Sequence, residues 1–188
     1  VIRAKAWRAA LYDAGLAGFG YPVEYGGAGD RPMEHAIWAE ESHGRVPAVD
    51  AVFGIGIGMA LPVIRDHGSA ELQQRFIAPG LRGDEIWCQL YSEPNAGSDL
   101  ASLATRAVRD GDEWIINGQK VWTSGAHRAD LAILLARTDP TSPKHRGITM
   151  LVLPMHQPGV TVRPLRQMTG VAEFNEVFID EARVPASW

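Results

Sequence analysis

The first part of the chain has the hydrophobic periodicity of helices. In residues 4–14, 32–43 and 49–66, apolar or small side chains recur at spacings of three and four, which places them on one face of a helix. Pro62 lies inside the third stretch, and proline lacks the backbone N–H that a helix interior needs. We therefore expect three helices, separated by glycines, with a kink or a split at Pro62.

A fourth helix is indicated by its end signals. Ser69 precedes the stretch 70–74 and has the hydroxyl of a typical N-cap, and Glu71 supplies an acidic group in the first turn. Pro79 and Gly80 follow, and such a pair is typical of a helix end. The part of the chain before the β-rich half is thus expected to form a small helical bundle.

The pattern changes near residue 85, where short β-rich runs divided by turns begin. Asp110-Gly111 and Asn117-Gly118 are hairpin signals, because these residue types tolerate the positive φ of tight turns. Strands at a spacing of about ten residues favour an antiparallel sandwich or barrel. The expected strands cover residues 86–92, 104–109, 113–116, 120–124, 131–137, 148–153, 160–164 and 176–180.

Together the two patterns predict an α+β protein. It has an N-terminal helical bundle over residues 1–84 and an antiparallel β-sandwich or barrel domain over residues 85–188, with the shift in periodicity near 82–84. The polar stretch 138–146, which contains two prolines, is interpreted as an exposed loop between two buried strands. With 46% hydrophobic residues, the chain can bury a substantial core.

Composition narrows the classes of partner and compartment. A formal net charge of -4 provides no basic field for a phosphate backbone, so nucleic acid is not an expected partner. Cys88 is the one cysteine, which excludes an intrachain disulfide and favours a reducing, cytoplasmic location. No apolar run approaches the ~20 residues that span a bilayer, so no membrane association is expected. Because the chain starts without Met and stops at Trp188, we expect further polypeptide beyond its ends.

Two short segments combine residue types that suit a cofactor site. The segment 91–99 reads Tyr-Ser-Glu-Pro-Asn-Ala-Gly-Ser-Asp, in which two hydroxyls flank a turn that can approach a phosphate or a planar ligand closely. In the stretch 120–125, strand alternation sends Trp122 and Ser124 to one face and Thr123 to the other. Taken alone, the serines are also ordinary turn hydroxyls, and the tryptophan is also an ordinary core residue.

These segments resemble two signatures of the acyl-CoA dehydrogenase family, Ser/Thr-Glu-Pro-x-Ala-Gly-Ser-Asp and Trp-x-Thr/Ser. The resemblance extends to residues 18–29 upstream and to 163–170 and 175–180 downstream, so it covers nearly the whole chain. It implies FAD as cofactor, with an indole on the flavin ring and hydroxyls near its edge. The implied cofactor contacts are Gln89, Leu90, Tyr91, Ser92, Gly97, Ser98, Trp122, Thr123 and Ser124, and the implied substrate contacts are Ser98, Phe174 and Asn175.

The same resemblance implies an activity and partners. Family members remove hydrogens from the α and β carbons of an acyl-CoA thioester and pass hydride to flavin, while a glutamate in a C-terminal helical bundle takes the proton. No residue of this chain matches that glutamate, so no catalytic residue is nominated. The implied partners are acyl-CoA, electron-transfer flavoprotein and further copies of the chain in a dimer or tetramer. A noncatalytic subunit of the same fold and an acyl-CoA oxidase are the alternatives.

Other features set limits on this interpretation. Many family members have an aromatic residue where this chain has Gln89, and threonine where it has Ser92 and Ser124. The resemblance therefore does not extend to the residues that tune the reduction potential of the flavin. The six histidines show no ligand spacing, so no metal site is expected. The glycines of 54–58 follow no strand, and we interpret them as close helix packing rather than as a dinucleotide motif. Glu93, within its tight turn, is interpreted as structural rather than as an acid–base group.

Overall fold

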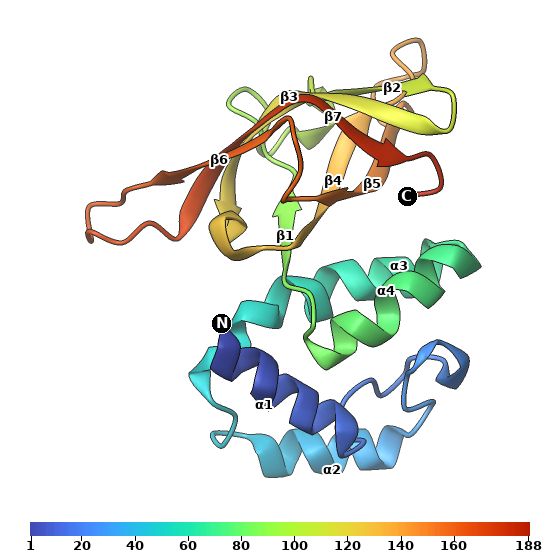
Figure 1. The fold of residues 1–188 in the computed structure, drawn as a ribbon, viewed down its shortest axis with the longest axis vertical. Helices are drawn as coiled ribbons and strands as arrows, with labels where there is room; N and C mark the ends of the chain where they lie inside the picture. The colour runs from blue at the N-terminus through green and yellow to red at the C-terminus, as the bar shows by residue number, and fades with distance from the viewer. The chain divides into compact units, whose positions relative to one another are not determined.

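The computed structural model of the protein describes the backbone of residues 1–188 and every side chain except those of residues 48 and 49. The chain divides into two compact units, the helical Val1–Ile86 and the sheet-containing Trp87–Trp188 (Figure 1), which is the α+β fold expected from the sequence. The helices are α1 (Ile2–Asp13), α2 (Pro32–Ser42), α3 (Leu61–His67) and α4 (Ala70–Arg82). Short 3₁₀ or π segments in this unit are η1 (Val23–Tyr25), η2 (Ala48–Phe53) and η3 (Gly56–Ala60).

The third expected helix is a helical stretch whose hydrogen bonding changes before Pro62. The segment η2 is a 3₁₀ helix, η3 is a π segment, and α3 begins at Leu61. Pro62 therefore lies in the first turn of α3, where a proline N–H is not needed. The wider π turn makes room for the proline ring against the preceding backbone. The interruption expected at Pro62 thus takes the form of a π segment.

Helix α4 begins as expected and ends later than expected. Ser69 Oγ accepts a backbone N–H of the first turn at 3.3 Å, which confirms the N-cap. Pro79 and Gly80, predicted to stop the helix, lie inside it, so that prediction is wrong. Gly80 allows a close approach to α3, since a Cβ there would lie 2.6 Å from Leu61 Cδ2, and this buried packing outweighs one lost hydrogen bond. Gly83, at φ 80°, follows the last turn.

Seven strands form one curled, mixed sheet in the second unit (Figure 1). They are β1 (Trp87–Leu90), β2 (Arg106–Asp110), β3 (Glu113–Ser124), β4 (Leu131–Arg137), β5 (Ile148–Pro154), β6 (Val160–Leu165) and β7 (Phe174–Pro185). The β2–β3, β3–β7, β4–β5 and β6–β7 pairs are antiparallel, as expected. β4 is parallel to β1 and β2, so the sheet is mixed, because the chain crosses over between these strands and returns in the same direction.

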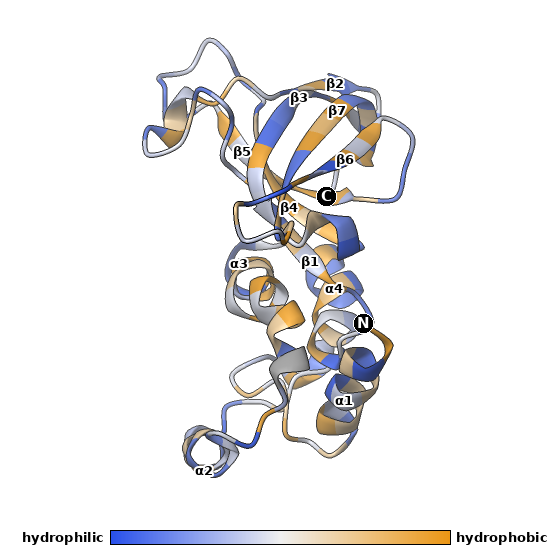
Figure 2. Ribbon diagram, turned by 90° about the vertical axis from the view of Figure 1, so that its left-hand side faces the viewer, coloured by the Kyte–Doolittle hydropathy of each residue, from blue (hydrophilic) through white to orange (hydrophobic). Residues whose placement is uncertain are grey.

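Strand β4 carries a nearly continuous apolar run because both of its faces are covered. Ala132, Ile133 and Leu134 have no exposed surface, and hydrophobic residues follow one another along the strand (Figure 2). A strand with one face in water would alternate instead. Burial of each large aliphatic side chain contributes about 1.5–3 kcal/mol to stability. The segment 138–146 joins β4 to β5 without a helix or strand, as expected.

One of the two predicted hairpins is present and the other is not. A two-residue loop after Asp110 joins β2 to β3, with Gly111 at φ 60°, as expected. Asn117-Gly118 lies instead inside β3, where the pairing with β7 shifts register, so the hairpin predicted there is wrong. A Cβ at Gly118 would overlap the side chain of Thr105. The glycine is therefore explained by a close approach within the sheet rather than by a turn.

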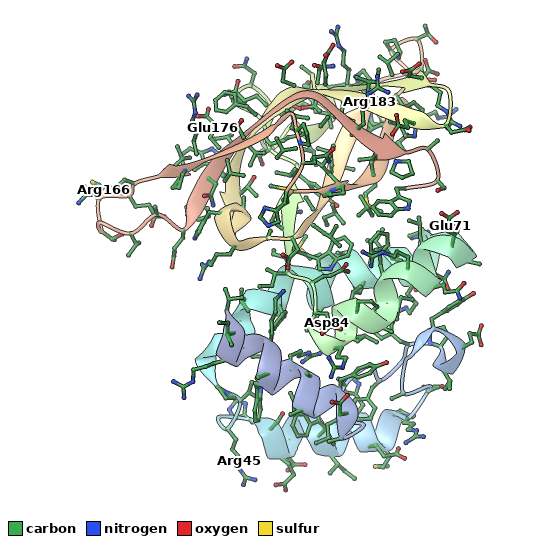
Figure 3. All side chains as sticks on the ribbon, viewed as in Figure 1. Arg45, Glu71, Asp84, Arg166, Glu176 and Arg183 are labelled. Carbon is green, nitrogen blue, oxygen red and sulfur yellow. The ribbon has the colours of Figure 1, made fainter. Side chains whose placement is uncertain are left out.

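Strand β7 is fastened to the β2–β3 hairpin by a cluster of ion pairs. Arg183, which is labelled in Figure 3, has its Nη1 3.0 Å from Asp110 Oδ2 and 2.9 Å from Glu113 Oε2. All three side chains are about half exposed, and ion pairs at such positions are screened by water. The β3–β7 pairing therefore depends mainly on its backbone ladder and buried side chains.

Candidate functional site

The two signature segments lie side by side in the sheet unit. Residues 91–99 follow β1 and begin with a tight turn, in which the backbone of Glu93 forms two hydrogen bonds at 2.9 and 3.1 Å. The amide of Val121 donates to Ser92 O at 2.9 Å, which joins this turn to β3 one residue before Trp122. Ser92 and Trp122 are therefore neighbours, as a shared cofactor site requires.

A buried ion pair holds this arrangement in place. Lys120 of β3 has no exposed surface. Its Nζ donates to Glu93 Oε1 at 2.9 Å and to the carbonyl oxygens of Tyr91 and Leu135 at 3.0 and 2.8 Å, so all three ammonium protons have acceptors. Glu93 in turn accepts the backbone amides of residues 104 and 105 at 2.6 and 2.9 Å. Lys120 thus ties the signature turn to β3 and β4.

The electrostatics of this pair follow from burial and hydrogen bonding. Burial lowers the pKa of Lys120 from its usual value, and the contact with Glu93 offsets part of that effect. For Glu93, burial acts to raise the pKa, but hydrogen bonds from residues 104–105 and from Lys120 outweigh it, so the pKa is lowered. Glu93 is therefore held ionised as an acceptor, in agreement with its structural interpretation.

Trp122 occupies a bulge in β3 and is exposed. Between Lys120 and Thr123, β3 carries one more residue than the facing part of β7. The Trp122 backbone has φ 62°, a left-handed conformation that costs a non-glycine residue about 1–2 kcal/mol. Its side chain is 64% exposed and meets the ring of Phe174 edge-on, with the centroids 6.2 Å apart. Strain of this kind is typical of binding sites rather than of core packing.

The residues after the bulge alternate as expected. Ser124 is exposed like Trp122, whereas Thr123 is buried. Thr123 Oγ1 has no hydrogen-bond partner among the residues that the structure describes. A buried hydroxyl of this kind is a place where a water molecule or a ligand is expected. The exposed indole and the Ser124 hydroxyl can therefore meet the same ligand.

The start of β7 closes the bulge. Asn175 has no exposed surface, and its Nδ2 donates to Thr123 O at 2.9 Å and to Glu173 O at 3.2 Å. Its Oδ1 lies 3.1 Å from Nδ1 of His127, in the short 3₁₀ segment η5 (Ala126–Arg128). Of the two predicted substrate contacts in this strand, Phe174 is half-buried beside the indole, whereas the amide of Asn175 is engaged within the protein.

The remaining predicted contacts lie along β1 and the turn after it. Leu90 is buried, and Gln89 and Tyr91 are partly buried near the end of β1. Burial raises the pKa of Tyr91, and a hydrogen bond with Gln89 opposes this effect. Gly97 and Ser98 are exposed on the turn that precedes the short segment η4 (Leu100–Ser102). These positions leave the proposed flavin contacts of this stretch as predictions.

Two polar residues of the site are absent from the sequence prediction. Lys120 could not have been recognised from strand alternation, which places it on the face of Trp122 and Ser124; the bulge between Lys120 and Thr123 puts it on the buried face instead. His127 gives no local signal either, because its contact with Asn175 joins residues 48 positions apart.

These residues suit a planar aromatic ligand with polar edges. The exposed indole offers a stacking face. Ser124 is exposed like Trp122, the backbone of Ser92 is joined to β3 beside it, and Thr123, on the other face of the strand, has a hydroxyl that is unpaired within the described part of the chain. The isoalloxazine ring of a flavin presents both an extended aromatic face and hydrogen-bonding edges, so the residues present fit this cofactor.

The described residues offer no cluster suited to a metal ion. No group of three histidine, cysteine, aspartate or glutamate side chains is placed to hold one in that part of the structure. None of the described helices has the length and hydrophobicity to cross a membrane.

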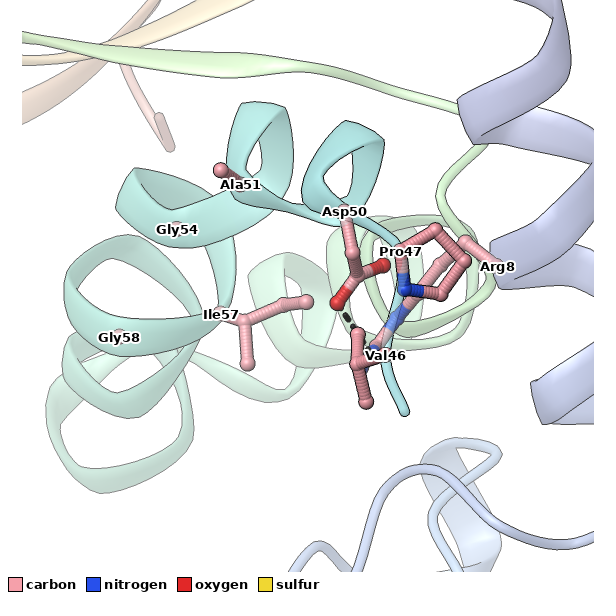
Figure 4. A pocket seen from close by; sticks show the side chains of 8 residues that line it. All are labelled: Arg8, Val46, Pro47, Asp50, Ala51, Gly54, Ile57 and Gly58. Atoms are coloured by element: carbon pink, nitrogen blue, oxygen red, sulfur yellow. Dashed lines mark ion pairs between the residues drawn. The ribbon is translucent and has the colours of Figure 1, made fainter. Parts of the chain in front are cut away.

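The helical unit has a cavity of its own, with a volume of about 520 Å³ (Figure 4). Its polar part is the ion pair between Arg8 Nη1 and Asp50 Oδ2, at 3.6 Å. A Cβ at Gly54 or Gly58 would meet no atom within 4 Å, so these glycines border open space, and the expectation of close helix packing is wrong for both. The lining residues are Arg8, Val46, Pro47, Asp50, Ala51, Gly54, Ile57 and Gly58.

Family models match both units of the chain. Residues 2–84 match the N-terminal domain of acyl-CoA dehydrogenase, and residues 88–182 match its middle domain. The chain belongs to the acyl-CoA dehydrogenase family. Acyl-CoA dehydrogenase IpdE1 of Mycobacterium tuberculosis is 48% identical over 183 residues, which are 97% of this chain and 47% of that relative. The chain thus spans about half the length of this acyl-CoA dehydrogenase.

Solved structures agree with this family assignment. A steroid ACAD named Tcur3481-Tcur3483 superimposes with a TM-score of 0.82 at 35% identity, covering 98% of this chain and 47% of that one. A glutaryl-CoA dehydrogenase from Mycobacterium smegmatis, solved in complex with FADH2, has a TM-score of 0.72 at 28% identity, covering 97% of this chain and 46% of that one. The fold of this acyl-CoA dehydrogenase family member is therefore shared over nearly all of its length.

Proposed function

We propose that the protein is a flavin-dependent acyl-CoA dehydrogenase that removes hydrogens from the α and β carbons of an acyl-CoA thioester. The observation that carries this proposal is the exposed, strained Trp122 beside Ser92 and Ser124 in a chain of this family. The FADH2 bound to the similar glutaryl-CoA dehydrogenase supports FAD as the cofactor.

In this proposal the residues of the chain bind and orient the reactants. The indole of Trp122 packs on the flavin ring, and Thr123 and Ser124 donate hydrogen bonds along the edge of that ring. Ser92 contacts the flavin from the turn that follows β1. The bound flavin supplies the hydride acceptor. Ser98 and Phe174 are proposed to contact the thioester. The α-proton is taken by a group outside this chain, because no residue here matches the family's glutamate.

Assembly and electron transfer are further parts of the proposal. The similar steroid ACAD carries the names of two proteins, Tcur3481 and Tcur3483, which supports assembly of this chain with other subunits, either copies of itself or a related chain. Electron-transfer flavoprotein is the proposed electron acceptor. The alternatives are a noncatalytic subunit that retains the fold and an oxidase that passes electrons to oxygen.

The test is an absorption spectrum of the full-length polypeptide that carries this sequence. A purified protein with bound flavin should lose its visible band when an acyl-CoA thioester is added anaerobically, and an electron acceptor should restore it. A noncatalytic subunit would keep the band unchanged. Hydrogen peroxide formed at the rate of thioester turnover in air would indicate the oxidase instead.

We also propose that the cavity of the helical unit takes a bulky acyl group. Its volume is in the range of small-molecule sites, and three of the residues that line it, Ala51, Gly54 and Gly58, are small. The structural similarity to a steroid ACAD supports a polycyclic acyl group, and the Arg8–Asp50 pair gives the cavity one polar side.

Gly54→Leu is expected to narrow this cavity and to discriminate between acyl groups. Gly54 has helical backbone angles and open space at its Cβ, so the side chain is accommodated by the fold and occupies the cavity. Binding of a steroid side-chain thioester should weaken by about tenfold or more, as overpacking costs about 1–3 kcal/mol. Butyryl-CoA binding, measured by the same flavin titration, should change little.

Gly54→Ala is the matched control, because it adds one methyl group at the same position. It should retain binding of the steroid thioester and raise helix stability by up to about 1 kcal/mol. An equal loss of both thioesters in the leucine variant would contradict the assignment of this cavity.

A further inference from the structure

The conformation of Trp122 requires contacts that hold it. A left-handed backbone is unfavourable for tryptophan, and an indole that is 64% exposed receives little packing from the protein. The bulge is held on one side by Lys120, whose ammonium group is fixed by three acceptors. On the other side, the first residue after the bulge is Thr123, and its carbonyl is bound by Asn175.

The two polar atoms of the Asn175 side chain have different partners. Nδ2 donates to the carbonyl oxygens of Thr123 and Glu173, and the same Glu173 oxygen accepts the amide of Gly125 at 2.9 Å. The end of β3, the turn after it and the start of β7 therefore converge on one buried amide. Phe174, whose ring meets the indole edge-on, is the residue before Asn175 in the chain.

The two carbonyl acceptors also determine the hydrogen on His127. They require the NH₂ group of Asn175 to point toward Thr123 and Glu173, so that Oδ1 points toward the imidazole. An amide oxygen only accepts, and His127 Nδ1 must therefore carry the hydrogen of the 3.1 Å contact. His127 is exposed, and it orients Asn175 from the surface.

We propose that Asn175, oriented by His127, is a positioning residue for the flavin wall, the name we give to residues 122–124 at the end of β3. In this proposal Asn175 acts by holding the bulge that presents Trp122. This inference rests on the proposed flavin site. It assigns the Asn175 side chain a positioning role in place of the direct substrate contact that the family resemblance implies. Asparagine suits the position because aspartate has no hydrogens for the two carbonyls and leucine has no polar atoms. Glutamine has one methylene more than a fully buried position allows.

The test compares Asn175→Asp with Asn117→Asp in the full-length polypeptide. Both changes replace an amide by a carboxylate of the same shape, but Asn117 accepts the amide of Glu181 through Oδ1, which aspartate retains. Hydrogen exchange of the amides of residues 121–126 should be about tenfold faster or more in Asn175→Asp, because two donors are lost and two carbonyls face a carboxylate. Asn117→Asp should exchange like the wild type in this segment.

FAD titration provides the second measurement. Asn175→Asp should bind FAD at least about tenfold more weakly and shift the visible band of the bound flavin, whereas Asn117→Asp should do neither. If Asn175→Asp does not fold, His127→Ala tests the positioning role in its place. His127 is exposed and contributes one hydrogen bond to Asn175, so the loss of its imidazole should weaken FAD binding by about threefold.

The outcomes separate the inference from the proposed function. Wild-type exchange and wild-type FAD affinity in a folded Asn175→Asp variant, or in His127→Ala when the aspartate variant is unfolded, would overturn the positioning role. A wild-type protein that binds no FAD would overturn the proposed function, whereas faster exchange of residues 121–126 would still establish that Asn175 holds the bulge.

Discussion

Replacing Lys120 with methionine is expected to lower the free energy of unfolding by about 3–5 kcal/mol, the cost of removing one partner of a buried ion pair. Methionine has a similar length but no charge, so Glu93 loses its cation and the carbonyl groups of Tyr91 and Leu135 lose a donor in a buried position. Urea denaturation followed by tryptophan fluorescence measures the effect. The turn at Ser92 should also become mobile, and flavin affinity should fall with it.

Lys144→Met is the matched control for this experiment. Lys144 pairs with Asp99 at 2.6 Å, but its side chain is 47% exposed, so its loss should cost less than about 1 kcal/mol. A double variant with Glu93→Gln should recover part of the stability lost in Lys120→Met, because it removes the unpaired charge and keeps an acceptor oxygen for the amides of residues 104 and 105. Equal losses in the two single lysine variants would show that the buried pair has no special role.

Trp122→Gly is expected to weaken FAD binding by about tenfold or more while leaving the fold intact. Stacking of an aromatic ring on a planar heterocycle contributes about 1–3 kcal/mol. Removal of the indole should cost little stability, because Trp122 is exposed and glycine adopts φ 62° without strain. FAD titration and thermal unfolding of the same samples measure the two effects separately.

Trp122→Ala separates the strain from the lost indole. Alanine also lacks the ring but keeps the left-handed penalty, so it should be less stable than Trp122→Gly by about 1 kcal/mol, and it should bind FAD equally weakly. Trp114→Ala, at a half-buried position of the same strand, should leave FAD affinity unchanged. Wild-type FAD affinity in both Trp122 variants would exclude the indole from the flavin site.

The agreement between sequence and structure is closest where the signal is local. The N-cap at Ser69 and the Asp110-Gly111 hairpin are confirmed, because each depends on residues within a few positions of one another. Asn117-Gly118 has the same local signal as Asp110-Gly111 but lies inside a strand. There the pairing with β7 and the close approach of Thr105 outweigh the turn preference.

In the candidate site, too, the local features could be predicted from the sequence and the long-range contacts could not. The hydroxyls, the turn and the indole of the two signature segments are properties of short stretches, and they suffice for the family resemblance. The register that brings Ser92 beside Trp122 comes from the pairing of β3 with the turn after β1.

The amino-acid sequence alone thus defines the division into a helical and a β half, the family and the residue types of the proposed flavin wall. Folding adds the bulge at Trp122, the Lys120–Glu93 pair and the Asn175 amide that closes the bulge. The pair joins residues 27 positions apart and the Asn175–Thr123 bond spans 52. Neither contact has a local signal, because each exists only once strand register has buried both partners against the same face of the sheet.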